Sequence, residues 1–403
     1  MPILPFLKNK KKSNKFLTIE IDNNQLKVLA LYKELDGKFK VIGSSNKILP
    51  ENTISNFYIL DKKLLTNVLI EAVLEATVEL EEDIKDVIFG VKGSQCIEIT
   101  TTAKATSTHK RIIKEGDLDE VYNKITEAAY IQAQNDIVRT NGDYDAELEI
   151  ILTSNVYFKI DGNFYDEPIG VEGEILECAL FNAFCYKKDL KTINQIIKDA
   201  KLNLLAVAPI PYSLVQNISL SNQEEKEDYT LINISPDSTQ IIIVFGKGLI
   251  DTKTLPLGHT QIIESFAHIM GLTTKESEKV TNSYILGQLK DEEEKVIQKC
   301  LNEVLYVWLE GVKLSFEEFS EIKTYANQIY ITGEGSVLPD IIEMFNSNQW
   351  YKEIPFKTSP TCKKININDF SKIQDATGKI NRIKWINTMA LSIIYLEQEE
   401  NND

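Results

Sequence analysis

The sequence predicts an α/β protein of two similar halves, each a mixed sheet flanked by helices, with a small strand–helix–strand insertion in the first half. Three observations predict this class. Each half opens with three short apolar strands and continues into helices, strand and helix periodicities alternate along the chain, and the aperiodic, charged segment 219–228 separates the halves. At about 150 residues per domain, the 403 residues are too many for one compact unit.

The first half begins with three strands that are rich in Val, Ile and Leu and are joined by Asn-Asn and Asp-Gly turns. They are expected at residues 16–21, 26–32 and 39–44. A helix is expected at 61–82, because apolar residues recur there at helical spacing and Asp61 is a suitable N-cap. Residues 84–90 return to a strand.

The next segment has a strand–helix–strand pattern. We expect a strand at 96–102, a polar loop, a helix at 117–135 and strands at 146–153 and 157–160. The first half then resumes with a strand at 173–186, a helix at 189–201 and a strand at 203–208.

The second half restarts with three strands and continues mainly as helix. The strands are expected at 229–234, 239–245 and 249–255, and the later elements are a strand at 328–332, a helix at 336–346 and a helix at 384–397. The helix after the acidic run 291–294 carries apolar residues that we assign to core packing in preference to a partner-binding groove. They are Val296, Ile297, Leu301, Val304, Leu305, Trp308, Val312 and Leu314.

These elements divide the chain into five parts. They are a basic and apolar tail at 1–15, a first half at 16–91 and 167–218, an insertion at 92–166, a second half at 229–383 whose helical part is about 258–323, and a C-terminal helix with an acidic tail at 384–403.

The composition excludes several classes of protein. With 43% hydrophobic and 26% charged residues, the chain is neither collagen-like nor wholly disordered, and a net charge of -16 repels nucleic acid. The five cysteines are scattered and the three histidines are far apart, so neither a metal site nor a histidine-based triad is expected. Reduced cysteines and the lack of an export signal or an apolar run of about 18 residues predict a cytoplasmic location.

Four stretches carry a family resemblance. They are Ile19–Lys27, Phe158–Gly173, Asn233–Gln240 followed by Leu255–His259, and Ile331–Pro339. Together they resemble FtsA, a cell-division protein family of the actin-like ATPase superfamily, over nearly the whole chain. The resemblance implies a duplicated actin-like fold with an inserted domain. It also implies that the first hairpin turn of each half holds the phosphates of ATP, with Mg²⁺, and that a glycine turn before a late helix holds the adenosine. It also implies a scaffold that recruits FtsZ filaments to the membrane.

The first phosphate turn departs from the D-I-G-[ST]-[ST] pattern that the resemblance implies. Glu20 replaces the Asp, and Asp22 stands where the Gly would be, so a carboxylate faces the phosphates. The hydroxyl positions are amides, and one cation of the region remains. These residues are Asn23, Asn24, Gln25 and Lys27.

The other two turns depart as well. In the second, Asn233 and Gln240 replace carboxylates, and Ser235, Pro236 and Asp237 replace three glycines, with Pro236 removing an N–H from the phosphate cradle. Ser238 and Thr239 complete this turn. The adenosine turn keeps Gly333 and Gly335 but places Glu334 between them and Ser336 after them.

We therefore expect a degraded nucleotide site, with no cofactor and no metal. The alternative is a functional site that binds ATP and uses Glu20 for Mg²⁺ indirectly. Plainer interpretations also stay open: Glu20 as an ordinary strand residue, Ser238 and Thr239 as strand formers, and Gly333 and Gly335 as a strand-to-helix turn with Ser336 as N-cap.

The N-terminal tail places apolar residues before lysines. Its membrane candidates are Ile3, Leu4, Phe6, Leu7, Lys8, Lys10, Lys11 and Lys12. Such a segment is suited to weak attachment to an anionic inner membrane surface, and a disordered basic leader is the alternative. The acidic C-terminal end, 396–403, would be repelled by the same surface.

These features predict a cell-division scaffold at the cytoplasmic face of the membrane. It would bind an FtsZ-like C-terminal peptide, self-associate into filaments or dimers, and have lost nucleotide hydrolysis. The alternatives are a slow actin-like assembly ATPase and a pilus-assembly protein of the PilM type.

Overall fold

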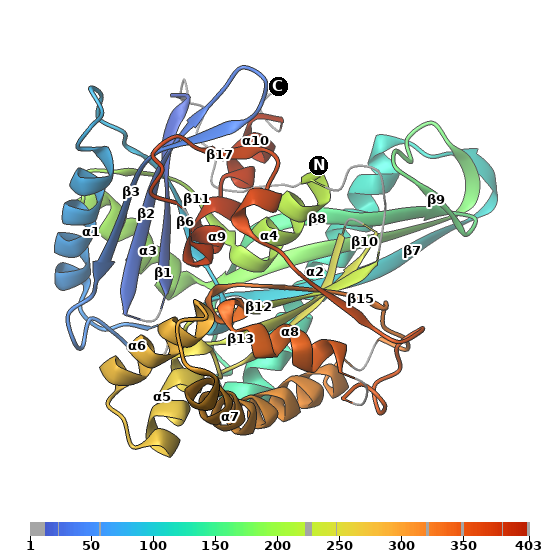
Figure 1. Ribbon diagram of the computed structural model, residues 1–403. Coiled ribbons are helices and arrows are strands. Elements are labelled where there is room, and N and C mark those ends of the chain that lie inside the picture. The colour runs from blue at the N-terminus through green and yellow to red at the C-terminus, as the bar shows by residue number, and fades with distance from the viewer. Residues whose placement is uncertain are drawn as a thin grey trace.

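The computed structural model describes residues 13–22, 24–55, 58–221, 228–246, 248–319, 322–347, 350–380 and 382–400. Its first sheet has six strands in the order β11-β6-β1-β2-β3-β17 (Figure 1). The strands are β1 Lys15–Asp22, β2 Gln25–Lys33, β3 Phe39–Ile48, β6 Asp86–Val91, β11 Asn203–Pro209 and β17 Ile373–Asp375. The expected three-strand opening is confirmed, since β1 pairs antiparallel with β2 and β2 pairs antiparallel with β3.

The second sheet repeats this plan in the order β14-β13-β12-β15-β16. Its strands are β12 Tyr229–Ile234, β13 Thr239–Phe245, β14 Gly248–Leu255, β15 Gln328–Thr332 and β16 Thr361–Lys364. In both sheets the opening strand, β1 or β12, pairs antiparallel with the next strand and parallel with a later one, β6 or β15. The expected duplication of the two halves is therefore present in the strand order.

The inserted unit is a sheet in the order β7-β10-β8-β9 with a long helix, α2, packed on it. Its elements are β7 Ile97–Ile112, α2 Glu115–Asn141, β8 Leu148–Ile160, β9 Asn163–Tyr165 and β10 Glu172–Tyr186. The strand predicted at 173–186 pairs with both β7 and β8, so this sheet continues beyond residue 166. The polar loop expected after residue 102 is instead strand as far as Ile112.

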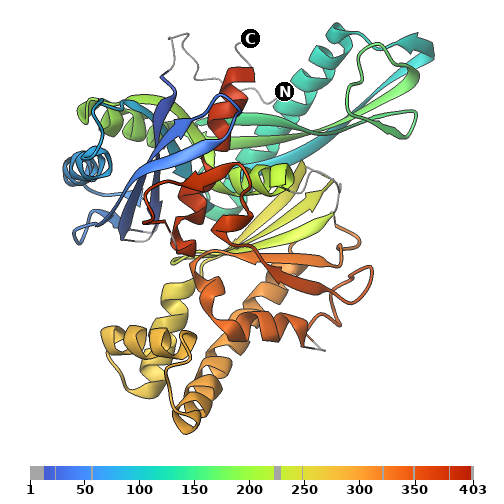
Figure 2. The same cartoon turned by 45° about the horizontal axis from the view of Figure 1, so that its top comes forward.

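Helices cover both faces of the first sheet (Figures 1 and 2). α1 packs on β2 and β3 and against α3, while α9 packs on β1 and β2 with α4 beside it. Within the described residues, the helices besides α2 are α1 Lys62–Thr77, α3 Lys187–Asp199, α4 Ile210–Ser221, α5 His259–Met270, α6 Thr274–Ile285, α7 Asp291–Glu317, α8 Pro339–Asn346, α9 Ile386–Ala390 and α10 Ile393–Glu400.

Several expected elements differ from the structure. α4, β16 and β17 were not expected. The predicted helix at 384–397 is a short 3-10 turn followed by α9 and α10, and this segment returns to the first half. Within α7 the predicted core positions are buried except Val296 and Leu314, which are exposed because they lie on the opposite side of the helix from the buried positions.

The short element between β15 and α8 also differs from the expectation. The helix predicted from residue 336 begins at Pro339, after the 3-10 turn Glu334–Val337. Among the described residues, no helix is long and apolar enough to cross a membrane, and no three His, Cys, Asp or Glu side chains gather as metal ligands.

Candidate functional site

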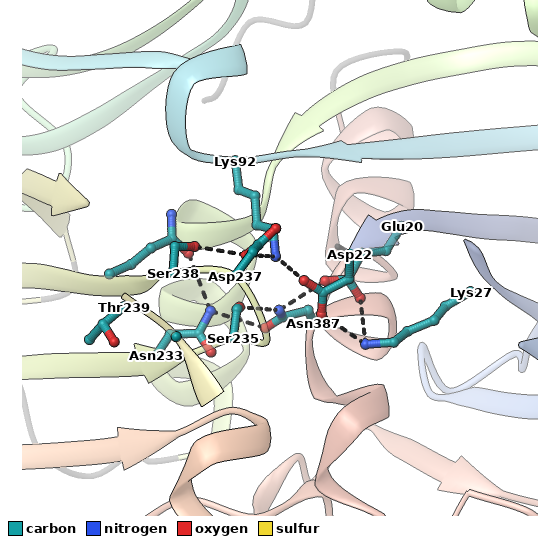
Figure 3. A network of polar contacts seen from close by, with 12 residues as sticks. Glu20, Asp22, Lys27, Lys92, Asn233, Ser235, Asp237, Ser238, Thr239 and Asn387 are labelled. Carbon is teal, nitrogen blue, oxygen red and sulfur yellow. Dashed lines mark hydrogen bonds and ion pairs between the residues drawn. The ribbon is translucent and has the colours of Figure 1, made fainter. Parts of the chain in front are cut away.

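The first and second predicted turns face each other between the two halves (Figure 3), and the third lies against the second, since Gly333 is close to Asn233 and Ile234. The first follows β1, the second joins β12 to β13, and the third follows β15. Because β1 and β12 run toward the same junction, their final residues face one another. The junction is polar but buried: Glu20, Asp22 and Asn233 are each at most 1% exposed.

Two lysines bind the Asp22 carboxylate. The Lys27 Nζ donates to Asp22 Oδ2 at 2.9 Å, and Lys92, directly after β6, donates to the other oxygen. Both lysine side chains are 1% exposed. Burial alone would raise the pKa of Asp22, but the two cations outweigh burial and hold it below its ordinary value. Asp22 is therefore a charged, fully paired group.

Lys92 also reaches the second half. Its Nζ lies 3.2 Å from Asp237 Oδ1, in the turn between β12 and β13. Burial opposes the charge of Lys92, but the carboxylates of Asp22, Asp237 and Glu20 raise its pKa above the ordinary value. One ammonium group thus joins the first and second predicted turns (Figure 3).

Glu20 is held by the C-terminal segment. Asn387 Nδ2 donates to Glu20 Oε1 at 2.9 Å, and Thr388 Oγ1 donates to Glu20 Oε2 at 2.7 Å. Lys27 Nζ is 4.0 Å from the same carboxyl and donates to the carbonyl of Lys384 at 2.9 Å. Burial raises the pKa of Glu20, although Lys27 partly offsets this. Glu20 is therefore a buried anchor of α9, which excludes the interpretation as an ordinary solvent-facing strand residue.

Amide and hydroxyl groups connect the second turn to α9. Asn233 Nδ2 lies 3.2 Å from both Gln240 Oε1 and Asn387 Oδ1, and Asn387 Nδ2 lies 3.3 Å from Ser235 Oγ. The Ser238 hydroxyl donates to Asp237 Oδ1 at 3.0 Å. These contacts join the second turn to α9, while Asn233 Oδ1 is buried without a hydrogen-bond partner among the described residues.

Thr239 faces away from the ion cluster. Its hydroxyl donates to the Leu257 carbonyl at 2.7 Å and accepts from Trp308 Nε1 at 2.9 Å, so it links β13 to α7. Pro236 accepts from the Thr260 N–H through its carbonyl at 2.9 Å. These contacts fix the turn against the start of α5.

The third turn requires its first glycine. Gly333 has φ of +85°, and a Cβ there would lie 2.5 Å from Asn233 Oδ1. Ser336 donates to the Gly333 carbonyl at 2.7 Å, so it closes this turn. The N-cap of α8 is Leu338, and the interpretation of Ser336 as the N-cap is therefore wrong. Burial raises the pKa of Glu334, and the nearby charge of Lys27 partly offsets this rise.

Some predicted residues lie elsewhere. Asn24 is exposed, and Gln25 accepts from Asn46 Nδ2 at 2.8 Å on the adjacent strand. Asn23 and the membrane candidates Ile3, Leu4, Phe6, Leu7, Lys8, Lys10, Lys11 and Lys12 lie outside the described residues.

The sequence analysis missed three residues of the network, Lys92, Asn387 and Thr388. A lysine directly after the apolar strand DVIFGV, and an Asn-Thr pair inside the apolar run of α9, were the available indications. Each places a polar group where the chain is otherwise buried.

Comparison with known proteins identifies the fold. No protein-family model matches the sequence, and no curated protein matches it. Among solved structures, the chain is similar to the "PilM-PilN type IV pilus biogenesis complex", with a TM-score of 0.67 and 13% identity over 94% of this chain and 98% of that chain. The chain has the actin-like ATPase fold.

A second solved structure gives the same fold. It is the ethanolamine utilization protein EutJ from Carboxydothermus hydrogenoformans, with a TM-score of 0.50 and 8% identity over 95% of this chain and 91% of that chain. The predicted fold class is thus confirmed. At these identities the likeness shows the actin-like fold alone, and what the fold does in this chain is argued from its own residues.

Proposed function

We propose that this chain is an actin-fold assembly scaffold that binds protein partners and has lost nucleotide hydrolysis. The observation that carries the proposal is the ion network at the junction. Lys92 and Lys27 occupy both oxygens of Asp22, and Lys92 also pairs with Asp237. Internal charges thus take the place that phosphates and their metal hold in an actin-like ATPase.

The residues do not fit Mg²⁺ and a nucleotide. Mg²⁺ needs carboxylate oxygens, and both oxygens of Asp22 already bind lysines. Phosphates need accessible N–H groups, but Pro236 has none and Asp237 adds a negative charge. Freeing Lys27 or Lys92 for a phosphate would break buried pairs, which typically costs about 3–5 kcal/mol.

Nucleotide titration tests this part of the proposal. Isothermal titration of the full chain with Mg-ATP and with Mg-ADP should give no heat of binding at nucleotide concentrations up to about 1 mM. Micromolar binding would overturn the proposed loss of the site and favour the slow assembly ATPase.

Two pathways are proposed for the scaffold. Pilus assembly is favoured by the TM-score of 0.67 to a PilM-PilN complex over nearly the full length of both chains. The bound partner there has the PilN name, so the corresponding partner of this chain would be a pilus-assembly peptide. Cell division is favoured by the four FtsA-like sequence stretches, and its partner would be an FtsZ-like C-terminal peptide.

Both pathways place the protein at the cytoplasmic face of the membrane. Self-association into filaments or dimers, and attachment of the N-terminal tail to anionic lipid, belong to the same proposal. Fluorescence anisotropy with a labelled FtsZ-type C-terminal peptide and a labelled PilN-type N-terminal peptide separates the pathways, because saturable binding of one peptide and not the other selects its pathway. Binding of neither would overturn the scaffold role in both.

A further inference from the structure

The outer face of α1 carries two adjacent stripes. Ile70, Leu74 and Val78 follow one another at four-residue spacing and are 38%, 64% and 74% exposed. Residues four apart lie on one helix face, so these side chains form an apolar row. The acidic residues one position further along form a parallel row, and three more acids follow the helix. These are Glu71, Glu75, Glu79, Glu81, Glu82 and Asp83. We call the two rows and these acids the α1 surface.

Part of the α1 surface is already neutralised. Lys47 pairs with Glu75, and Lys379 lies 3.3 Å from Glu79. Glu71, Glu81 and Asp83 are exposed and have no ion pair within the described part of the chain. An apolar row beside uncompensated acids is suited to a segment that has both apolar and basic residues.

The described chain begins next to this surface. Lys15 Nζ lies 2.7 Å from Glu82 Oε2, Tyr395 donates to the Ser13 carbonyl at 2.7 Å, and Lys33 donates its N–H to the Asn14 carbonyl at 2.8 Å. Residues 13–15 are therefore fixed beside the end of α1. The twelve residues before them lie outside the described part.

The order of residues in the tail matches the order of the α1 surface. The lysines at positions 8 and 10–12 are nearest to Lys15, where the acids 79–83 lie, and the apolar residues 3–7 are further away. From Val78 to Ile70 is about 12 Å along the helix, and eight to twelve extended residues span at least about 26 Å. The tail can therefore reach the whole apolar row, running parallel to α1, with its first residues nearest Ile70 and its lysines nearest the acids 79–83.

We propose that residues 3–12 bind the α1 surface of the same chain, with the lysines on Glu79, Glu81 and Asp83 and the apolar residues on Val78, Leu74 and Ile70. This contact does not depend on the proposed function. It makes the tail self-sequestering: the same lysines and apolar residues are unavailable to anionic lipid while they are bound to α1. Membrane attachment then requires release of the tail.

Carbodiimide crosslinking of the full chain tests where the tail binds. Equal amounts of ¹⁴N- and ¹⁵N-labelled protein are mixed, and mass spectrometry should find crosslinks from Lys8, Lys10, Lys11 or Lys12 to Glu79, Glu81 or Asp83 within one isotope. Mixed-isotope crosslinks would overturn the proposal in favour of a second copy as occupant. Crosslinks only to acids elsewhere would also overturn it.

A charge variant tests the effect of the contact. Glu81→Gln with Asp83→Asn should speed tryptic cleavage after Lys8–Lys12 about fivefold, as expected from losing two exposed charge contacts. Glu264→Gln with Glu278→Gln removes the same number of exposed acids from the second half and should leave the rate unchanged. Equal rates in the two variants would overturn the proposal.

Sedimentation with lipid vesicles tests whether the α1 surface and anionic lipid compete for the tail. The Glu81→Gln, Asp83→Asn variant should sediment with vesicles of phosphatidylcholine and roughly one third phosphatidylserine more than the unaltered chain does. Deletion of residues 1–12 should abolish that gain. Equal sedimentation of the variant and the unaltered chain would overturn the coupling between release and attachment.

Discussion

Lys92 Nζ lies 3.2 Å from Asp237 Oδ1, and this contact joins the end of β6 in the first half to the β12–β13 turn in the second. The same ammonium group binds Asp22, so one side chain connects two turns that hold phosphate in an ATPase of this fold. The protein's own Lys92 side chain therefore supplies the connection between the two halves.

Replacing Lys92 should strongly destabilise the junction. Lys92→Met keeps the apolar stem but leaves Asp22 with one cation and Asp237 without Lys92, so we expect a loss of about 3–5 kcal/mol in the free energy of unfolding. Urea denaturation measures it. Lys104→Met is the control. It removes the pair of the exposed Lys104 with Glu177, which keeps its contact with Lys159, and should cost less than about 1 kcal/mol. Equal losses of unfolding free energy in both variants would contradict a larger contribution of the buried Lys92 pairs to stability.

The contribution of Asn387 to stability should depend on its contact with Glu20. Asn387→Ala removes the donor at 2.9 Å from Glu20 and the partner of Asn233, and leaves two buried polar groups short of a hydrogen bond. We expect a loss of about 2–6 kcal/mol, from about 1–3 kcal/mol for each of the two groups. In a double-mutant cycle with Glu20→Gln, the two losses should not add. Additive losses would contradict a direct contact.

Glu98 gives the stability a specific pH dependence. Burial raises its pKa from 4.5 to about 7, and Asp251 adds to the rise, while the Thr252 hydroxyl donates to it at 2.6 Å across the contact between β7 and β14. Because the folded state binds this proton more tightly than the unfolded state, stability should fall as pH rises from about 4.5 to about 7.

The matched variant isolates that effect. Glu98→Gln keeps an oxygen that accepts from Thr252 and carries no charge at any pH. Its Tm should exceed that of the unaltered chain at pH 8, and the difference should shrink toward zero as pH falls to about 4.5. A Tm difference that is constant with pH would contradict the assignment.

Gly333 should tolerate no side chain. Gly333→Ala adds a Cβ that lies 2.5 Å from Asn233 Oδ1 and 2.6 Å from the Ile234 carbonyl, on a residue with φ of +85°. Gly378→Ala is the matched control, with φ of +67° and nothing within 4 Å of the new Cβ. We expect about 1–2 kcal/mol for the control from backbone strain alone, and a clearly larger loss for Gly333→Ala, both measured by urea denaturation.

The sequence predicted the two sheets well because their strands are long apolar runs with clear turns. β1 to β3 and β12 to β14 were found for this reason. Short or locally ambiguous elements were missed. β17 has three residues, and it forms a strand because it pairs with the edge of β3, which is more than 300 residues away in sequence. Helix α4 begins directly after β11, and the sequence analysis assigned no element to its residues after the strand predicted at 203–208.

The candidate site was predicted only in part. Family spacing located the turns, and the substitutions at Asp22 and Asp237 were noted as charges that oppose phosphate. Their partner Lys92 was missed, because it is 70 residues from Asp22 and 145 residues before Asp237, and no local pattern links them. A buried ion network is a property of the tertiary structure, and a single sequence gives the charges without their pairing.

The return of the chain end to the first half has a consequence for synthesis. Tyr395 stacks on Phe16 with ring centroids 4.3 Å apart, β17 completes the first sheet, and Asn387 and Thr388 hold Glu20. On the ribosome, the first half therefore emerges without its sixth strand and without the covering helix α9 until residues 373–390 have been translated. Its exposed sheet edge and apolar face make the nascent chain, more than the finished protein, the form that needs a chaperone.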